Sequence, residues 1–122
     1  MVRTFALVFG AVYLLVGLGG FVLASPILGI FAVNAPHNIV HIAVGLLWLS
    51  AALMAPMGPN SARTASKVIG IVYLLVAILG FAAPALVDSL LAINMADNLL
   101  HLGTAVLALY AGFMTPAEPA TA

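Results

Sequence analysis

Two short segments of the chain carry the same polar pattern within an otherwise apolar sequence. The pattern reads Asn-x-x-His/Asp-Asn-x-x-His, and its polar residues are Asn34, His37, Asn38, His41, Asn94, Asp97, Asn98 and His101. Spacings of three and four residues place side chains on one face of an α-helix. We therefore expect two polar helical stripes, which together form a candidate ligand-binding or structural cluster.

The residue types limit the chemistry of this cluster. Histidine and aspartate can transfer protons, and imidazole also binds haem iron and transition metals. The first segment has His37 where the second has Asp97, so a base would face an acid if the stripes meet. Asparagines are poor transition-metal ligands, so we predict no metal site. Only His37, His41, His101 and Asp97 could serve an enzyme, and we predict no catalytic residue and no enzymatic activity. The first asparagine of each segment stands where a helix N-cap is expected.

The elements that carry the stripes are predicted from composition. The 122 residues are 66% hydrophobic and 5% charged, whereas soluble domains average roughly 25% charged residues. Four apolar stretches approach the roughly 20 residues that cross a bilayer core. They run Phe5–Ala24, Pro36–Ala55, Val68–Ala83 and Met95–Thr115, and the third is the shortest. We expect an all-α chain with residues 1–122 as a single membrane domain.

The chain repeats itself at an offset of 60 residues. Arg3–Pro56 aligns with Arg63–Pro116 without a gap, and 20 of the 54 pairs are identical. The predicted fold is therefore a four-transmembrane-helix bundle made of two tandemly repeated helical hairpins, repeat 1 over 3–56 and repeat 2 over 63–116. A repeat with two spans returns to its starting side, which predicts pseudo-two-fold symmetry along the membrane normal.

The basic residues predict the orientation in the membrane. Arg3, Arg63 and Lys67 lie outside the hairpin loops 25–35 and 84–94, which contain no Lys or Arg. The positive-inside rule then makes both termini cytoplasmic in a multi-pass protein. The hairpin loops are apolar but too short to span, so we expect them to be interfacial segments on the outer side.

Three functions fit the cluster. Polar residues can hydrogen-bond between helices and stabilise the bundle, with His37 and Asp97 as a structural pair. Ionisable groups about 10 Å inside a membrane often form a small-molecule or ion site. Alternatively, His41 and His101 could be the axial ligands of a b-type haem or a chlorin, with Gly45 and Ala105 leaving room for the macrocycle.

The duplicated motif resembles that of an uncharacterised family of small bacterial four-helix integral membrane proteins, known only as a domain of unknown function. The matching residues are Asn34, Pro36, His37, Asn38, His41 and Gly45, then Asn94, Asp97, Asn98 and His101. The proline stands one place later than the family pattern has it, and Ala105 replaces an expected glycine. The resemblance covers nearly the whole chain and implies a bacterial plasma membrane, but it supplies no activity.

We predict a small integral membrane protein without catalytic activity. Its cluster lies in the outer half of the second and fourth helices, stabilises the bundle and is available to a small ligand or partner. No cofactor is expected, and a haem b or chlorin protein using His41 and His101 is the alternative. The partners are the lipid bilayer and a larger membrane complex or homo-oligomer. The formal net charge of zero gives no reason to expect a nucleic-acid partner.

Overall fold

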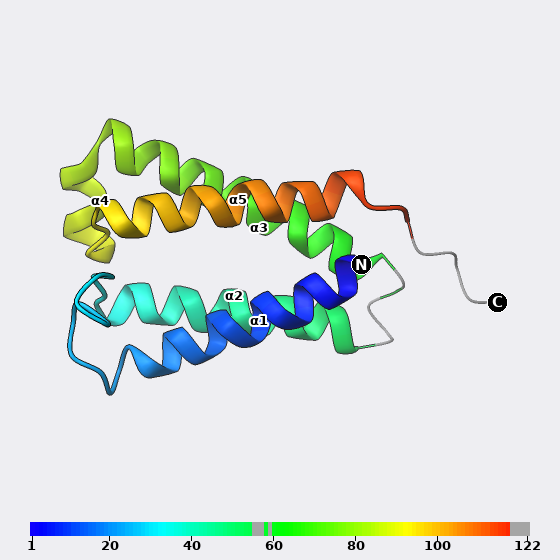
Figure 1. Cartoon of the computed structure of the whole chain (residues 1–122), viewed down its shortest axis with the longest axis horizontal. Coiled ribbons are helices and arrows are strands. Elements are labelled where there is room, and N and C mark those ends of the chain that lie inside the picture. The colour runs from blue at the N-terminus through cyan, green and yellow to red at the C-terminus, as the bar shows by residue number, and fades with distance from the viewer. Residues whose placement is uncertain (55–57, 59, 118–122) are drawn as a thin grey trace.

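The computed structural model describes residues 1–54, 58 and 60–117. Within them the chain forms five helices and no strand, which confirms the all-α prediction (Figure 1). The helices are α1 (Val2–Gly19), α2 (Ala35–Leu53), α3 (Ser61–Ala82), α4 (Pro84–Leu91) and α5 (Met95–Met114). Residues 55 and 56, at the end of the predicted first repeat, lie outside the described residues.

The helix boundaries differ from the apolar stretches in two places. Helix α3 has 22 residues and begins at Ser61, so it is the longest helix rather than the shortest span. The polar first turns of α3 are helical because their side chains bind other helices, and the Ser61 hydroxyl donates to the Ala51 carbonyl. Hydropathy marks the part of a helix that can lie in lipid, not its full length.

The second hairpin segment, 84–94, contains a helix of its own. Pro84 begins α4, where the missing N–H of proline costs no hydrogen bond. Ala92 then takes a left-handed conformation with φ of 52° and ends the helix. Helices α4 and α5 meet at 93°. The first hairpin loop, 20–34, has no helix at the equivalent place.

Three helices, α1, α2 and α3, are each long and apolar enough to cross a membrane. Helix α5 qualifies when it is counted with α4 as one bent span, which raises the number to four among the described residues. These lengths and compositions suggest a membrane protein.

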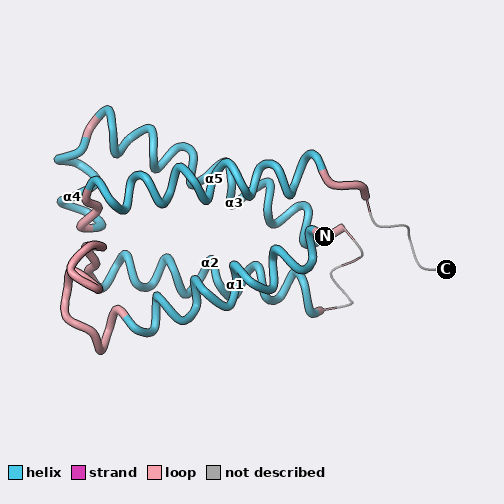
Figure 2. The backbone as a smooth tube through the Cα atoms, in the orientation of Figure 1, coloured by secondary structure: helices cyan, strands magenta, loops and turns pink. Residues whose placement is uncertain are grey.

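The helices pack in two pairs. Helix α1 packs along α2 and α3 along α5, and contacts between the pairs are fewer. We call residues 1–54 the N-terminal half and residues 60–117 the C-terminal half. Figures 1 and 2 show the start of α1 and the end of α5 at one end of the bundle, with α4 and the loop 20–34 at the other.

Glycines allow the paired helices to touch. A Cβ on Gly45 would lie 2.5 Å from the Leu14 nitrogen and 2.8 Å from the Gly10 carbonyl oxygen. Small residues at helix contacts are typical of membrane bundles, where close packing replaces the hydrophobic effect between helices. Large apolar side chains instead lie outside: Leu15 is 68% exposed and Tyr110 is 57% exposed. Large aliphatic side chains therefore cover much of the surface, and many of the buried residues are small, aromatic or polar.

Trp48 joins the two halves near the middle of the bundle. Its side chain is fully buried, and its Nε1 donates to the Ser66 hydroxyl at 3.1 Å. The indole also packs edge-on against Phe5 and Tyr13, at centroid distances of 5.6 Å each. The tryptophan is a core residue and not part of an interfacial aromatic belt.

Candidate functional site

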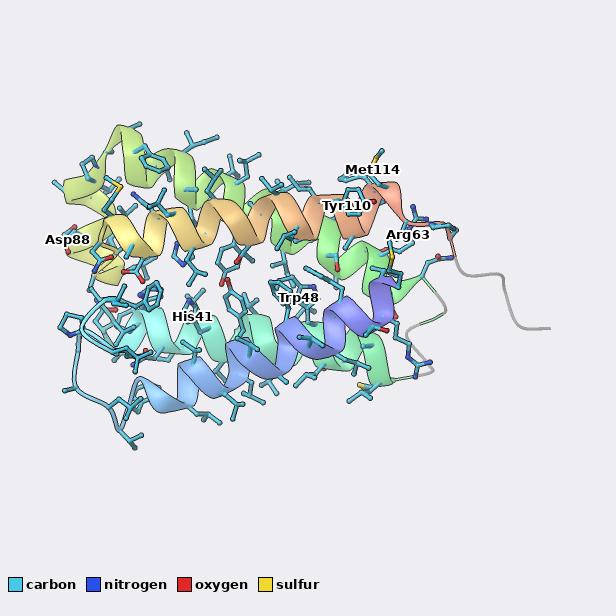
Figure 3. The ribbon with its side chains drawn as sticks, in the orientation of Figure 1. His41, Trp48, Arg63, Asp88, Tyr110 and Met114 are labelled. Carbon is cyan, nitrogen blue, oxygen red and sulfur yellow. The ribbon has the colours of Figure 1, made fainter. Side chains whose placement is uncertain are left out.

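Three histidines from the two halves meet inside the bundle. His37 and His41 come from α2 and His101 from α5, and each is no more than 4% exposed. The ring centroids are 4.4 Å apart for His37 and His41, 5.6 Å for His37 and His101, and 6.0 Å for His41 and His101. Figure 3 shows His41 pointing into the space between the halves. We call these three residues the histidine trio.

The trio converges because of helix geometry and side-chain length. His37 and His41 are four residues apart, so they lie on the same face of α2, one turn apart. Helices α2 and α5 are not among the closely packed pairs, and the imidazoles span the distance between their backbones. The expected convergence of the two stripes therefore occurs through side chains.

The ring nitrogens of the trio lack partners. None of the six makes a well-formed hydrogen bond within the part of the chain that the structure describes. Leaving a buried donor or acceptor unsatisfied costs about 1–3 kcal/mol. Buried polar groups without partners are rare in native proteins, so each needs an explanation, such as a bound water or ion. The trio has six of them together.

Two tyrosines flank the trio on the side toward the middle of the bundle. Tyr13 packs against His41, and Tyr73 against His101, each at a centroid distance of 5.0 Å. The two tyrosine rings are 5.4 Å apart. The Tyr13 hydroxyl and the Thr104 hydroxyl are 2.7 Å apart and share a buried hydrogen bond between α1 and α5. Tyr13 also packs against Trp48, so it lies between that side chain and His41 of the trio.

A cavity opens beside the trio. It has a volume of about 140 Å³ and lies between α1 and α5, with His41 from α2 on its wall. Tyr13 and Thr104 also line it, and the other lining residues are apolar. The His41 side chain therefore forms part of the wall of a small, mostly apolar space.

Asn34 and Asn94 cap the two helices, as expected. The Asn34 side chain accepts from the His37 backbone N–H at 2.9 Å, and Asn94 accepts from that of Asp97 at 3.0 Å. Each amide group also crosses to the other half. Asn34 Nδ2 donates to the Leu90 carbonyl at 3.2 Å, and Asn94 Nδ2 donates to the Ile30 carbonyl at 2.8 Å.

Asp97 lies near His37, but the hydrogen bonds of its carboxylate go to the backbone. One carboxylate oxygen accepts from the backbone N–H of Asn94 at 3.0 Å and from that of Ala32 at 3.1 Å. Neither ring nitrogen of His37 makes a well-formed hydrogen bond among the described residues, and the backbone of Ala32 and Leu91 lies near this side chain. The carboxylate still lies close enough for its charge to act on His37. Asp97 therefore hydrogen-bonds to the loop 20–34 of the N-terminal half, and His37 packs against the other two histidines.

Asn38 and Asn98 lie within their own halves and do not hydrogen-bond between the halves through their oxygens. A Cβ added to Gly20 would lie 2.0 Å from Asn38 Oδ1, and one added to Gly80 would lie 1.7 Å from Asn98 Oδ1. Both Oδ1 atoms are buried without a partner among the described residues. Each amide therefore occupies the space that a side chain at the facing glycine, Gly20 or Gly80, would need.

The room expected for a macrocycle is not at the predicted place. Gly45 faces the backbone of Leu14 and Gly10, so its missing side chain serves helix packing. Ala105 is fully buried. His37 also lies beside both predicted axial ligands, His41 and His101. The haem or chlorin alternative stays a prediction without this geometric support.

Sequence reasoning did not find the Tyr13–Thr104 bond or the place of His37 in the trio. Thr104 corresponds to Val44 in the first repeat, so the duplicated pattern carried no signal for it. The substitution of His37 by Asp97 pointed to an acid–base pair, whereas the loop backbone captures the acid.

These features define an all-α protein with three or four helices that could span a membrane and a polar cluster enclosed between its halves. The chain belongs to the family described as Domain of unknown function (DUF4383), which matches residues 3–114. No curated protein and no solved structure matches the chain. The family match confirms the resemblance to a family of unknown function and leaves the role of the cluster to be argued from its geometry.

Proposed function

We propose that the chain is a small multi-pass integral membrane protein without catalytic activity, whose polar cluster joins two halves and binds a small ligand. In this proposal α1, α2, α3 and the bent pair α4–α5 are the four spans. The protein lies in a bacterial plasma membrane with both termini cytoplasmic. Its proposed partners are the lipid bilayer and either a second copy of the chain or a larger membrane complex.

A tandem duplication underlies this arrangement. Residues 60 apart make corresponding contacts: Tyr13 with His41 and Tyr73 with His101 have the same centroid distance of 5.0 Å. The amides of Asn34 and Asn94 likewise donate to carbonyls of residues 90 and 30. These pairs support two repeated hairpins with a pseudo-two-fold axis along the membrane normal.

The basic end of the bundle supports the orientation. Arg3 Nε donates to the Ala52 carbonyl at 2.8 Å, and Lys67 lies 4.7 Å from the centre of the Phe113 ring. Figure 3 places Arg63 at this end and Asp88 at the opposite one. Basic residues at one end of a bundle favour its cytoplasmic placement.

One observation carries the ligand-binding role: the six ring nitrogens of the trio are buried, and none makes a well-formed hydrogen bond among the described residues, although the backbone of Ala32 and Leu91 lies near His37. In a cluster that served stability alone, these nitrogens would be hydrogen-bonded, or apolar side chains of similar shape would stand in place of the histidines. Buried polar groups without hydrogen bonds destabilise the folded protein. A ligand that bonds to the imidazoles would remove this cost. Asp97 already accepts two backbone N–H groups, which supports a structural and non-catalytic role for it.

The test is native mass spectrometry of the protein purified from membranes in mild detergent. We expect the wild type to carry a small adduct that His41→Leu lacks, because the variant removes the imidazole that borders the cavity. Ser66→Ala is the matched control, since it is buried but hydrogen-bonds to Trp48 away from the trio. An adduct-free wild type, together with an unfolding temperature of His41→Leu at or above the wild-type value, would show that the trio is only packing.

A further inference from the structure

We propose that the histidine trio binds a divalent transition-metal ion of the Zn²⁺ type, with His37, His41 and His101 each supplying one ring nitrogen. This inference deepens the proposed ligand-binding function and rests on it. It runs against the expectation from sequence that the chain has no metal site.

The geometry suits a single ion. One nitrogen from each imidazole can be chosen so that all three lie within 4.8 Å of one another. Tetrahedral zinc with Zn–N bonds of about 2.0–2.1 Å holds its nitrogens about 3.3 Å apart. Rotations about the side-chain torsions would have to close this difference, and His37 and His41 lie one turn apart on the same face of α2.

The donor set selects the class of metal. Imidazole nitrogen suits Zn²⁺, Cu²⁺ and Ni²⁺, whereas Mg²⁺ and Ca²⁺ prefer oxygen ligands. The ring nitrogens are available as ligands without breaking any well-formed hydrogen bond among the described residues. Three histidines leave a fourth coordination position for water or a small anion, as in three-histidine zinc sites.

The asparagines do not argue against this site. From the sequence they share a stripe with the histidines, and amides are poor ligands for such metals. In the structure, however, Asn38 and Asn98 point at Gly20 and Gly80 and not at the trio. The side chains that the fold brings together as metal ligands are therefore all imidazoles.

The charge around the site is compatible with a cation. Asp97 is buried near His37, and in its charged form it acts electrostatically on that side chain. Tyr13 and Tyr73 are the other titratable groups that pack against the trio. The three basic residues lie in the first turns of α1 and α3, at the opposite end of the bundle from Asp88. A dication in a low-dielectric site benefits from a nearby carboxylate.

A metal bound here would also link the two halves. Two ligands come from α2 and the third from α5, between which the backbone contacts are few. Binding to the folded state alone stabilises it by mass action. The metal would thus act across the same boundary as the Asn34 and Asn94 hydrogen bonds.

The experiment uses the full chain, purified without a polyhistidine tag and stripped with a chelator, and titrates it with Zn²⁺, Co²⁺ and Mg²⁺. The chain contains only three histidines, all of them in the trio, so every histidine signal reports this site. We expect one Zn²⁺ per chain, shifts of all three ¹⁵N-labelled imidazoles, visible absorption from tetrahedral Co²⁺, and a rise in unfolding temperature that Mg²⁺ does not reproduce.

Variants separate the trio from other sites. His101→Gln and His37→Gln should each weaken Zn²⁺ binding by at least about 10-fold, since losing a ligand costs no less than losing its supporting group. Ser66→Ala should bind as tightly as the wild type. Unchanged Zn²⁺ affinity in both histidine variants, or unshifted imidazoles in the wild type, would overturn the metal site. The imidazole measurement needs no variant, so it decides even if a variant fails to fold.

The outcomes also distinguish this inference from the proposed function. An organic adduct that depends on His41, with no Zn²⁺ binding, overturns the metal site and keeps the ligand site. Failure of both measurements overturns both proposals.

Discussion

Asn34 and Asn94 each cap the start of one helix and hydrogen-bond to the other half of the molecule. Through its oxygen each caps its own helix, and through its nitrogen each donates to a carbonyl across the boundary, at Leu90 or at Ile30. His37 follows the first cap by three residues, so the bonds that align the helix also place the first imidazole of the trio. Helix capping and assembly of the site therefore depend on the same two side chains.

We predict that Asn94→Ala lowers the free energy of unfolding in detergent by about 1–4 kcal/mol. The change removes an N-cap, worth about 0.5–2 kcal/mol, and a hydrogen bond between the halves, worth about 0.6–1.7 kcal/mol in a membrane protein. Denaturant titration followed by the fluorescence of Trp48 would measure it. Asn94→Asp retains a capping oxygen and loses the donor to Ile30, so it should cost less than the alanine change; an equal cost would mean that the cap contributes nothing.

Gly45→Ala should destabilise the bundle by about 1–3 kcal/mol, as over-packing does. The added Cβ would lie 2.5 Å from the Leu14 nitrogen, so α1 must move away from α2. The same titration measures this effect. Gly103→Ala is the matched control in α5, where no atom lies within 4 Å of the added Cβ and higher helix propensity should leave stability equal or slightly raised. Equal effects of the two changes would show that α1 and α2 are not in close contact at Gly45.

The Tyr13–Thr104 hydrogen bond should show energetic coupling between the halves. In a double-mutant cycle of Tyr13→Phe and Thr104→Val, we expect a coupling of about 0.6 kcal/mol, with an upper limit of about 1.7 kcal/mol. Each single change leaves a buried hydroxyl without its partner, whereas the double change removes both. Unfolding of the four proteins in one detergent gives the value. Strictly additive costs would mean that the two hydroxyls do not bond in the membrane protein.

Single cysteines should report the orientation, because the natural chain has none. Ser89 is exposed on α4, and Ala117 is exposed just after α5, so each can be replaced by cysteine in a separate variant. We expect a membrane-impermeant maleimide to label the first in intact cells and the second only after lysis. The reverse pattern would invert the proposed topology, and labelling of both in intact cells would contradict a hairpin repeat.

The local features could be predicted from particular residues. Asn34 and Asn94 cap their helices because a side-chain oxygen at that position accepts the free backbone N–H groups of the first turn. His37 and His41 share a face because their spacing is one helical turn. The boundaries were less predictable: Ser61 starts α3 well before the apolar run, because hydrogen bonds to another helix hold the polar turn.

The sequence by itself determined the helices, their apolar surfaces and the two polar stripes, since these depend on interactions between near neighbours and on the solvent around each helix. Only the tertiary structure decided which polar groups meet. Asp97 binds the backbone of Ala32, a residue far away in the chain, and this leaves His37 to join His41 and His101. Such partners depend on the path of a loop and the distance between helices, and no local periodicity encodes either quantity.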